Sequence, residues 1–401
     1  MSGRRDPLRD LRAPGEPDAR RRAWDVASAA FEERAARAGR AGRAPVWRRP
    51  ALVAAAAAAL LVAALSPPGS AVAGWLGDAV RSVVEEDRPP ARASGLDELP
   101  GGGRVLVLAA PRDGGPAEPW IAGDAGHRRL TGPVHDATWS RAGRFVGLAR
   151  GSELLAVDLH GRRRWTVAAP GPVHALRWSP DGYRVAYTAG AELRLVAGDG
   201  TGDRRVAFRR RAGTTTAFPA LAWRPGARHV LAFADRRTLF VADTDERRVL
   251  WRRRSPNLTT VEFSADGTRL LAAGRRRVSV LAARDGRTLA QARARPGTTL
   301  AAATWARTGR RLALVRRTAT RAEVLVGRPA RNRIRLRRLF AAGELSLAGF
   351  SPDGRWLLVD WDETGTWLFL PVDGGRARQL TAAGRRFRAR DATPRSWCCP
   401  P

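Results

Sequence analysis

Arginine occurs in short runs that lie apart along the chain from most of the acidic residues. A guanidinium group can form two parallel hydrogen bonds with a phosphate or a carboxylate, so grouped Arg side chains indicate an anion-binding surface. The Arg residues concerned are Arg209, Arg210, Arg211, Arg236, Arg237, Arg252, Arg253, Arg254, Arg275, Arg276, Arg277, Arg316 and Arg317. The acidic residues that could neutralise them are Asp199, Asp203, Asp243, Asp245, Glu246, Asp285 and Asp373. A binding surface forms only if the fold gathers the first set and keeps the second away from it.

An aromatic residue followed by a turn recurs through the chain. The anchors of this repeat are Trp139, Trp178, Trp223, Phe263, Trp305 and Phe350, and neighbouring anchors are 39 to 45 residues apart. Longer phrases also recur, since "GPVHDATWS" at 132–140 is matched by "GPVHALRWS" at 171–179. A period of this size with short strands is typical of β-propeller blades.

The turn after the aromatic is clearest in "WSPDG" at 178–182, "FSADG" at 263–267 and "FSPDG" at 350–354. Pro presets φ, Asp can accept a hydrogen bond from the backbone ahead of it, and Gly takes a positive φ. We therefore interpret one set of residues as structural turn residues: Asp181, Gly182, Asp266, Gly267, Asp353 and Gly354. A large flat side chain buries much apolar area, so we expect the aromatic anchors to wedge between neighbouring blades.

Four strand patterns in each repeat predict an all-β fold, a β-propeller of four-stranded blades over residues 100–397. An apolar stretch before each anchor predicts the inner strand, and three further strand patterns follow the turn. Residues 103–132 read as three strands without an anchored inner strand, and "RRFRARDATPRSW" after Ala382 is too polar to assign. We expect seven blades, one of them a composite of both chain ends, with six as the alternative. Residues 398–401 are interpreted as a tail.

The repeat resembles those of the TolB-like and WD-repeat-like propellers of bacterial envelope proteins, whose blades carry the same aromatic-Ser-Pro-Asp-Gly turn. The resemblance covers about residues 100–397 and is weaker at Trp139, Trp223 and Trp305, where the Asp is missing. The Gly-His and Trp-Asp dipeptides of eukaryotic WD repeats do not recur at blade positions, which favours the bacterial relatives. The resemblance implies a platform for protein binding, although a fold alone does not determine function.

Composition limits what the net charge of +33 can mean. The chain contains no Lys, so all 71 basic residues are Arg, a pattern typical of a GC-rich bacterial genome. The high net charge therefore partly reflects codon usage, and we do not expect nucleic acid to be a partner. The two cysteines, Cys398 and Cys399, are adjacent and so rarely bridge each other, because the ring that they would close is strained.

One apolar segment, "ALVAAAAAALLVAALS" at 51–66, is long enough to be a marginal membrane helix or the core of a signal peptide. We expect a retained single-pass signal anchor over residues 47–67, because the Arg-rich leader before it is far longer than that of a usual signal peptide. The leader, residues 1–46, would lie in the cytoplasm and the propeller outside the cell membrane. The alternative is secretion after cleavage near Ala73.

Two segments beside the anchor show helical spacing of apolar residues. In the leader, Trp24, Phe31 and Ala35 follow a capping Asp18, so residues 18–39 predict a short helix that docks on a cytoplasmic regulatory protein. A weakly ordered basic linker is the alternative for this stretch. Residues 68–99 predict an amphipathic juxtamembrane helix, from Trp75 to Val84, followed by a linker.

The blade pattern sorts the charged residues by loop. In a blade, the loops joining strands one to two and three to four share one face, and the other loops share the opposite face. The acidic residues fall in the three-to-four turns, whereas the Arg runs fall in the two-to-three loops and in the connections between blades. Arg247, Arg248, Asp362 and Glu363 are exceptions. We therefore expect an Arg-lined anion-binding surface on one face of the central blades, and a solvated basic surface is the alternative.

Motifs for catalysis, cofactors and metals are missing from the sequence. It contains no G-x-S-x-G, P-loop, G-x-G-x-x-G after a strand, or H-E-x-x-H. We expect no enzyme activity, no catalytic residues, no cofactor and no metal site. The function favoured is a membrane-tethered extracytoplasmic platform that binds an envelope protein or an anionic wall polymer. The alternative is a single-pass, anti-sigma-like sensor that couples the propeller to a cytoplasmic partner.

Overall fold

The computed structural model describes residues 99–123, 126–206, 220–226, 229–235, 237–308 and 310–399, which belong to one compact unit. The leader, the apolar segment 47–67 and the juxtamembrane residues 68–98 lie outside the described residues. Within the described ranges, no helix is both long and apolar enough to cross a membrane.

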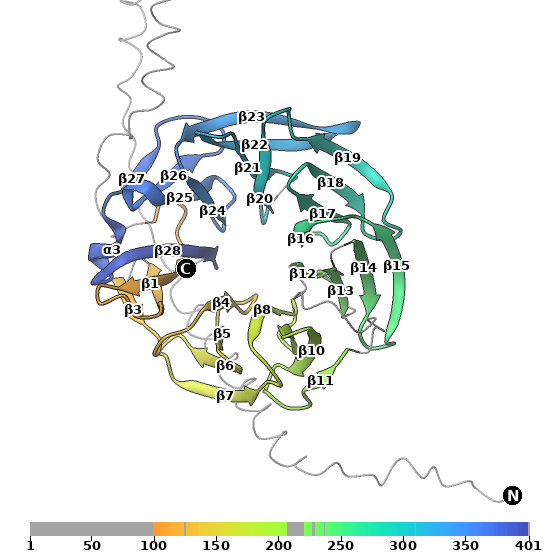
Figure 1. The fold of residues 1–401 in the computed structure, drawn as a ribbon, viewed down its shortest axis with the longest axis vertical. Helices are drawn as coiled ribbons and strands as arrows, with labels where there is room; N and C mark the ends of the chain where they lie inside the picture. Colours follow the sequence, from red (N-terminus) through yellow and green to blue (C-terminus); the bar gives the residue numbers. More distant parts are fainter. Residues whose placement is uncertain are drawn as a thin grey trace, which may run out of the picture. The chain divides into compact units, whose positions relative to one another are not determined.

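The described residues form seven four-stranded antiparallel units, which we number as blades in chain order (Figure 1). Blade 1 contains β1 (Arg104–Pro111), β2 (Glu118–Gly123), β3 (Gly126–Arg129) and β28 (Ala389–Cys398). Blade 2 contains β4 (Asp136–Trp139), β5 (Phe145–Arg150), β6 (Glu153–Asp158) and β7 (Arg163–Ala168). Blade 3 contains β8 (Val173–Trp178), β9 (Arg184–Ala189), β10 (Glu192–Ala197) and β11 (Arg204–Arg205). Blade 4 contains β12 (Ala220–Trp223), β13 (Val230–Ala234), β14 (Thr238–Asp243) and β15 (Arg248–Arg254).

The last three blades follow the same order. Blade 5 contains β16 (Leu258–Phe263), β17 (Arg269–Gly274), β18 (Arg277–Ala282) and β19 (Thr288–Arg293). Blade 6 contains β20 (Thr299–Trp305), β21 (Leu312–Arg317), β22 (Ala322–Ala330) and β23 (Asn332–Ala342). Blade 7 contains β24 (Leu345–Phe350), β25 (Trp356–Trp361), β26 (Thr366–Pro371) and β27 (Arg378–Leu380). Two short helical turns, η1 (Asp362–Thr364) and α3 (Ala383–Arg386), complete the described elements.

The ring is closed by a composite blade. Blade 1 has the strand order β28-β1-β2-β3, so the last strand of the chain is the innermost strand of the blade that begins the propeller. β28 contacts β24 of blade 7 on one side and β4 of blade 2 on the other, and the remaining inner strands contact one another in sequence. The topology therefore agrees with the expected seven blades and the composite closure rather than with six.

The polar C-terminal segment, which the sequence left unassigned, forms α3 and β28. Pro394 lies within β28, where its missing N–H is tolerated because the inner strand is an edge of its sheet. A register shift lies beside it, between Leu106 and Val107 of the paired strand. Arg395 donates to Asp136 Oδ1 in blade 2 at 2.8 Å, so this charged side chain joins two blades.

The core consists of seven apolar clusters in the described residues, and each cluster lies between two neighbouring blades. Every aromatic anchor is buried in one of these clusters, which confirms the expected wedge between blades. Trp397 is a seventh anchor in the cluster that joins blades 7 and 1. Its indole N–H donates to the Gly102 carbonyl at 2.8 Å, and its ring meets Phe369 edge-on, with the centroids 5.6 Å apart.

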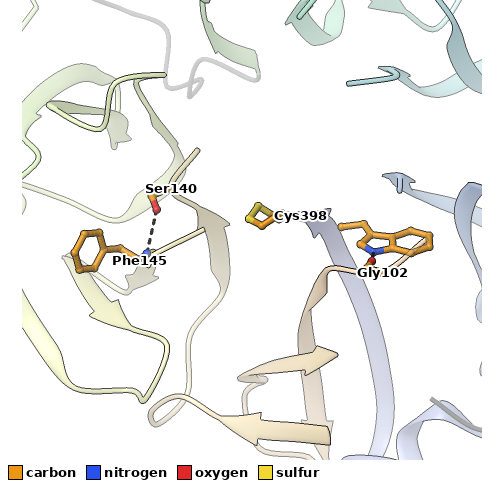
Figure 2. The surroundings of a disulfide bond; sticks show 6 residues. Gly102, Ser140, Phe145 and Cys398 are labelled. Carbon is orange, nitrogen blue, oxygen red and sulfur yellow. Dashed lines mark hydrogen bonds between the residues drawn. A yellow bond between two sulfur atoms is a disulfide. The ribbon is translucent and has the colours of Figure 1, made fainter. Parts of the chain in front are cut away.

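Contrary to the expectation from their spacing, Cys398 and Cys399 are joined by a disulfide. Both residues are buried in the cluster between blades 1 and 2. The disulfide abuts the first turn of blade 2, where the Phe145 N–H donates to Ser140 Oγ at 3.0 Å (Figure 2). Gly143 in this turn has φ of 67°, and a Cβ at this position would lie 2.0 Å from the Cys399 Sγ. Only glycine fits this contact, so Cys399 lies directly against blade 2.

Replacing Trp397 with Ala tests the composite closure. We expect Trp397→Ala to lower the free energy of unfolding by about 3–5 kcal/mol, because it empties the core between blades 7 and 1. Tyr183, an exposed aromatic residue of blade 3, provides the control, and Tyr183→Ala should change stability by less than about 0.5 kcal/mol. Urea unfolding measures both. Equal urea midpoints for the two variants would contradict the idea that packing of Trp397 in β28 stabilises the ring.

Candidate anion-binding surface

The Asp-Gly turns lie on one face of the propeller, together with the three-to-four turns, and we call this the turn face. In blade 3, Asp181 Oδ1 accepts hydrogen bonds from Ser179 Oγ at 2.5 Å and from the Tyr183 N–H at 3.0 Å. Asp266 and Asp353 accept the corresponding bonds in blades 5 and 7. Gly182, Gly267 and Gly354 have φ of 81°, 66° and 72°. These six residues are therefore occupied in holding the turns.

Hydrogen bonding outweighs burial at two of these carboxylates. Burial acts to raise the pKa of Asp181, but the bonds from Ser179 and Tyr183 and the nearby His229 lower it overall. For Asp266, burial likewise acts against the bonds from Ser264 and Thr268, and the net pKa is lowered. Both side chains are therefore charged acceptors rather than candidates for proton transfer.

A polar network that sequence reasoning missed joins blades 3 and 4 on the turn face. His229 Nε2 lies 2.7 Å from Asp181 Oδ2, and His229 Nδ1 lies 2.8 Å from Asp245 Oδ2. Asp245 also pairs with Arg184, which donates to Thr244 Oγ1 at 3.1 Å. Nothing in the spacing of these residues signals the network, because it depends on how two blades pack.

The acidic residues of the three-to-four turns are also engaged. Asp243 is buried and accepts two backbone N–H groups, Asp203 pairs with Arg194 at 2.7 Å, and Asp373 pairs with Arg311. Asp199 and Asp285 accept backbone N–H groups within their own turns. The turn face is thus acidic in composition but largely neutralised by local contacts.

The opposite face, which carries the two-to-three loops and the connections between blades, is called the loop face. Four of the predicted ligand-binding residues, Arg209, Arg210, Arg211 and Arg236, lie outside the described residues. Three others have partners within the protein. Arg253 donates to the Gly286 carbonyl at 2.6 Å, Arg316 pairs with Glu323, and Arg317 donates to the Leu345 carbonyl at 3.0 Å.

Six predicted residues are exposed and make no ion pair with any residue in the described ranges: Arg237, Arg252, Arg254, Arg275, Arg276 and Arg277. The first three belong to blade 4, where Arg254 pairs across the sheet with Thr238, the neighbour of Arg237. Of the other three, Arg275 and Arg276 form the two-to-three loop of the adjacent blade 5, and Arg277 begins β18, where it lies opposite Arg293. The structure therefore gathers part of the predicted Arg set at one end of two neighbouring blades.

The loop face also has an acidic sector in blade 7. Asp360 is buried, and burial together with the neighbouring Asp362 and Asp391 raises its pKa to about 8. Asp362 also has a raised pKa, because of burial and the charges of Asp391 and Glu344. The exception noted in the sequence at Asp362 is thus part of a larger acidic cluster, which separates blade 7 from the exposed Arg residues that the structure describes in blades 4 and 5.

Comparisons with solved structures show the fold. A chain in the crystal structure of the mitotic checkpoint complex is similar with a TM-score of 0.54 and 15% identity, covering 71% of this chain and 95% of that chain. The C-terminal WD40 domain of Sif2 is similar with a TM-score of 0.51 and 12% identity, covering 71% and 86%. A chain of Kuenenia stuttgartiensis hydrazine synthase is similar with a TM-score of 0.51 and 16% identity, covering 68% and 90%. No protein-family model and no curated protein sequence matches the chain. The described residues therefore have a WD40-like β-propeller fold.

The acidic sector predicts a stability that falls as the pH rises. Asp360 keeps a proton in the folded state that it releases on unfolding, so stability decreases from about pH 4 to about pH 8. Asp360→Asn removes this proton exchange, and we expect its melting temperature to exceed that of the unmodified protein at pH 8 and to vary less with pH. Asp373→Asn in the same blade is the control, because the pKa of Asp373 is lowered. An unchanged pH profile for Asp360→Asn would contradict the assignment.

Proposed function

We propose that this protein is a non-enzymatic binding platform, a membrane-tethered extracytoplasmic β-propeller that recognises an anionic envelope protein or polymer through the loop face of blades 4 and 5. One observation carries the proposal. Six exposed Arg side chains of that face lack an ion pair with the described residues, whereas the acidic side chains of the turn face are paired or bonded in turns. Codon usage raises the total number of Arg residues but does not produce this difference between faces.

The chemistry of Arg supports an anionic ligand. Each guanidinium group offers a planar set of donors that matches phosphate and carboxylate, and it stays charged at every physiological pH. A side chain that already binds within the protein, such as Arg253 or Arg316, has fewer donors left for a ligand. The side chains of Arg275, Arg276 and Arg277 are exposed, and none of them forms a hydrogen bond or an ion pair with a described residue. These three residues are therefore the centre of the proposed surface.

The envelope location rests on the sequence. The apolar segment 47–67 follows an Arg-rich leader, which favours an N-terminus in the cytoplasm and a propeller outside. The resemblance to bacterial TolB-like propellers supports the same compartment.

Reporter fusions at Pro401 test this topology. We expect an alkaline phosphatase fusion, which needs an oxidising compartment, to be active, and a fluorescent reporter that folds only in the cytoplasm to be dark. The opposite pattern would place the propeller in the cytoplasm and would remove envelope ligands from consideration.

A triple substitution tests the binding surface. Replacing Arg275, Arg276 and Arg277 with Ser should weaken retention of the protein on an anionic polymer, more strongly at low salt than at high salt, because exposed charges are screened over about 8–10 Å at physiological ionic strength. Replacing the exposed Arg385, Arg386 and Arg390 with Ser removes the same charge from another part of the ring. Equal loss in both triple variants would mean that total charge, and not the loop face, governs binding.

A further inference from the structure

Blades 5 and 6 differ from the other described blades because their outer edges are hydrogen-bonded to each other. β23 pairs in parallel with β19 through Ala290 with Asn332 and Gln291 with Arg333, which creates one eight-stranded sheet. β22 and β23 are longer than β20 and β21 of the same blade, and Figure 1 shows them along the rim of the ring. The two blades thus form a single folded sheet with an inner and an outer side at their seam.

The inner side of this seam is apolar. Ala290 and Ala292 of β19 pack in the same cluster as Ile334 and Leu336 of β23, between the two blades. Because side chains alternate along a strand, the neighbouring residues of both strands point to the outer side. On β23 these neighbours are Arg333 and Arg335, and both are exposed.

Register places four Arg side chains in one row on the outer side. Arg277 lies opposite Arg293 in the β18–β19 ladder, and Arg328 lies opposite Arg335 in the β22–β23 ladder. The parallel ladder ends at Gln291 with Arg333, and continuing its register by two residues places Arg293 level with Arg335. Neighbouring strands are about 4.8 Å apart, so the row spans roughly 14 Å. We call Arg277, Arg293, Arg328, Arg333 and Arg335 the basic seam.

The basic seam contains two unfavourable pairings. Like charges directly opposite each other destabilise a pair of strands, and both Arg277–Arg293 and Arg328–Arg335 are of this kind. None of the five residues forms an ion pair with another described residue, although Arg328 is close enough to Asp373 to lower its pKa. The fold therefore holds these positive charges near one another with no direct ion pair to a described residue, and Asp373 is the carboxylate whose pKa responds to one of them.

The β22–β23 hairpin carries three of the five seam residues and is held in place. Arg337 donates to the Val372 carbonyl of blade 7 at 2.7 Å, and Arg311 pairs with Asp373 of the same turn. Gly327 allows close approach of the two hairpin strands, because a Cβ there would lie 2.0 Å from the Arg335 carbonyl oxygen. A fixed hairpin presents its guanidinium groups without the loss of freedom that a mobile loop would suffer on binding.

We propose that the basic seam, continuous through Arg277 with the loop residues Arg275 and Arg276, is an extended site for a linear phosphate-bearing polymer that has no bases. This inference rests on the proposed function and names its ligand class. A row of positive charges at regular spacing matches a chain of phosphates. A single phosphate headgroup would contact only part of this row. Single-stranded nucleic acids are bound with the help of aromatic side chains that stack on the bases. Tyr183, on the turn face, is the exposed large apolar side chain of the described residues, so the seam offers charge without a stacking surface.

Binding of inorganic polyphosphate to the full-length protein tests the seam. We expect long-chain polyphosphate to bind at least about tenfold more tightly than tripolyphosphate, which is too short to span the row. Replacing Arg293, Arg333 and Arg335 with Gln should abolish this preference for the long chain and lower the slope of log affinity against log salt by roughly 2, at about 0.7 per lost contact for a single-stranded polyanion. Without ligand, Arg335→Gln should raise the melting temperature slightly, because it removes an opposed like-charge pair.

Gln substitutions at Arg385, Arg386 and Arg390 are the matched control and should leave the long-chain preference intact. Equal losses in control and seam variants, or equal affinity for both chain lengths, would overturn the seam. A single-stranded oligonucleotide of equal charge that binds more tightly than polyphosphate would overturn the ligand class. For this comparison the loop variant is Arg275→Ser with Arg276→Ser, which leaves the seam residue Arg277 in place. Loss in the seam variant alone, with this loop variant unaffected, would support the seam while removing the loop from the proposed function. Loss in the loop variant alone would leave the proposed function standing without the seam.

Discussion

Face-to-face packing of apolar blades is the interaction on which the rest of this structure depends. Each of the seven clusters is shared by two neighbouring blades, so no blade has a buried core of its own. A ring of this kind is stable only when the last interface is made, and Trp397 makes it from the final strand of the chain. The disulfide of Cys398 and Cys399 and the bond from Arg395 to Asp136 add contacts to blade 2 at the same point. The two ends of the propeller are therefore bound into a single blade.

Because the buried apolar side chains lie between the blades, the outer edges and the loops contribute little to the core and can carry charged residues. The charged residues differ between the turn face and the loop face. On the turn face, carboxylates such as Asp181 and Asp243 accept backbone N–H groups, and their charge is used to hold short turns. On the loop face of blades 4 and 5, Arg side chains replace them and have no such role, because guanidinium groups cannot accept a hydrogen bond. The difference in charge between the two faces thus follows from hydrogen bonding, because a carboxylate can accept N–H groups of its own turn and a guanidinium group cannot.

Local patterns in the sequence predicted the blades, but not the contacts that depend on register between distant strands. The anchors from Trp139 to Phe350 are each followed by a recognisable turn, whereas "CCPP" follows Trp397 and carries no such turn, which hid the seventh anchor. Arg316 and Arg317 belong to the expected loop class but are bound to Glu323 and Leu345, a pairing that spacing cannot reveal. Arg293 and Arg335 escaped notice for the same reason, since only the β19–β23 ladder brings residues 42 positions apart to one level.

The seam also shows how a propeller can remain stable with an unfavourable arrangement of charges. Opposed Arg pairs each weaken their strands by a fraction of a kcal/mol, up to about 1 kcal/mol. The inner side of the same strands buries Ala290 and Ile334 and covers part of Leu336. Full burial of an Ile or Leu side chain is worth about 1.5–3 kcal/mol. Packing on one side of the sheet therefore exceeds repulsion on the other, and the strands stay paired with the repulsion unrelieved. A polyanion that relieves it would gain affinity from strain already present in the free protein, without any rearrangement of the blades.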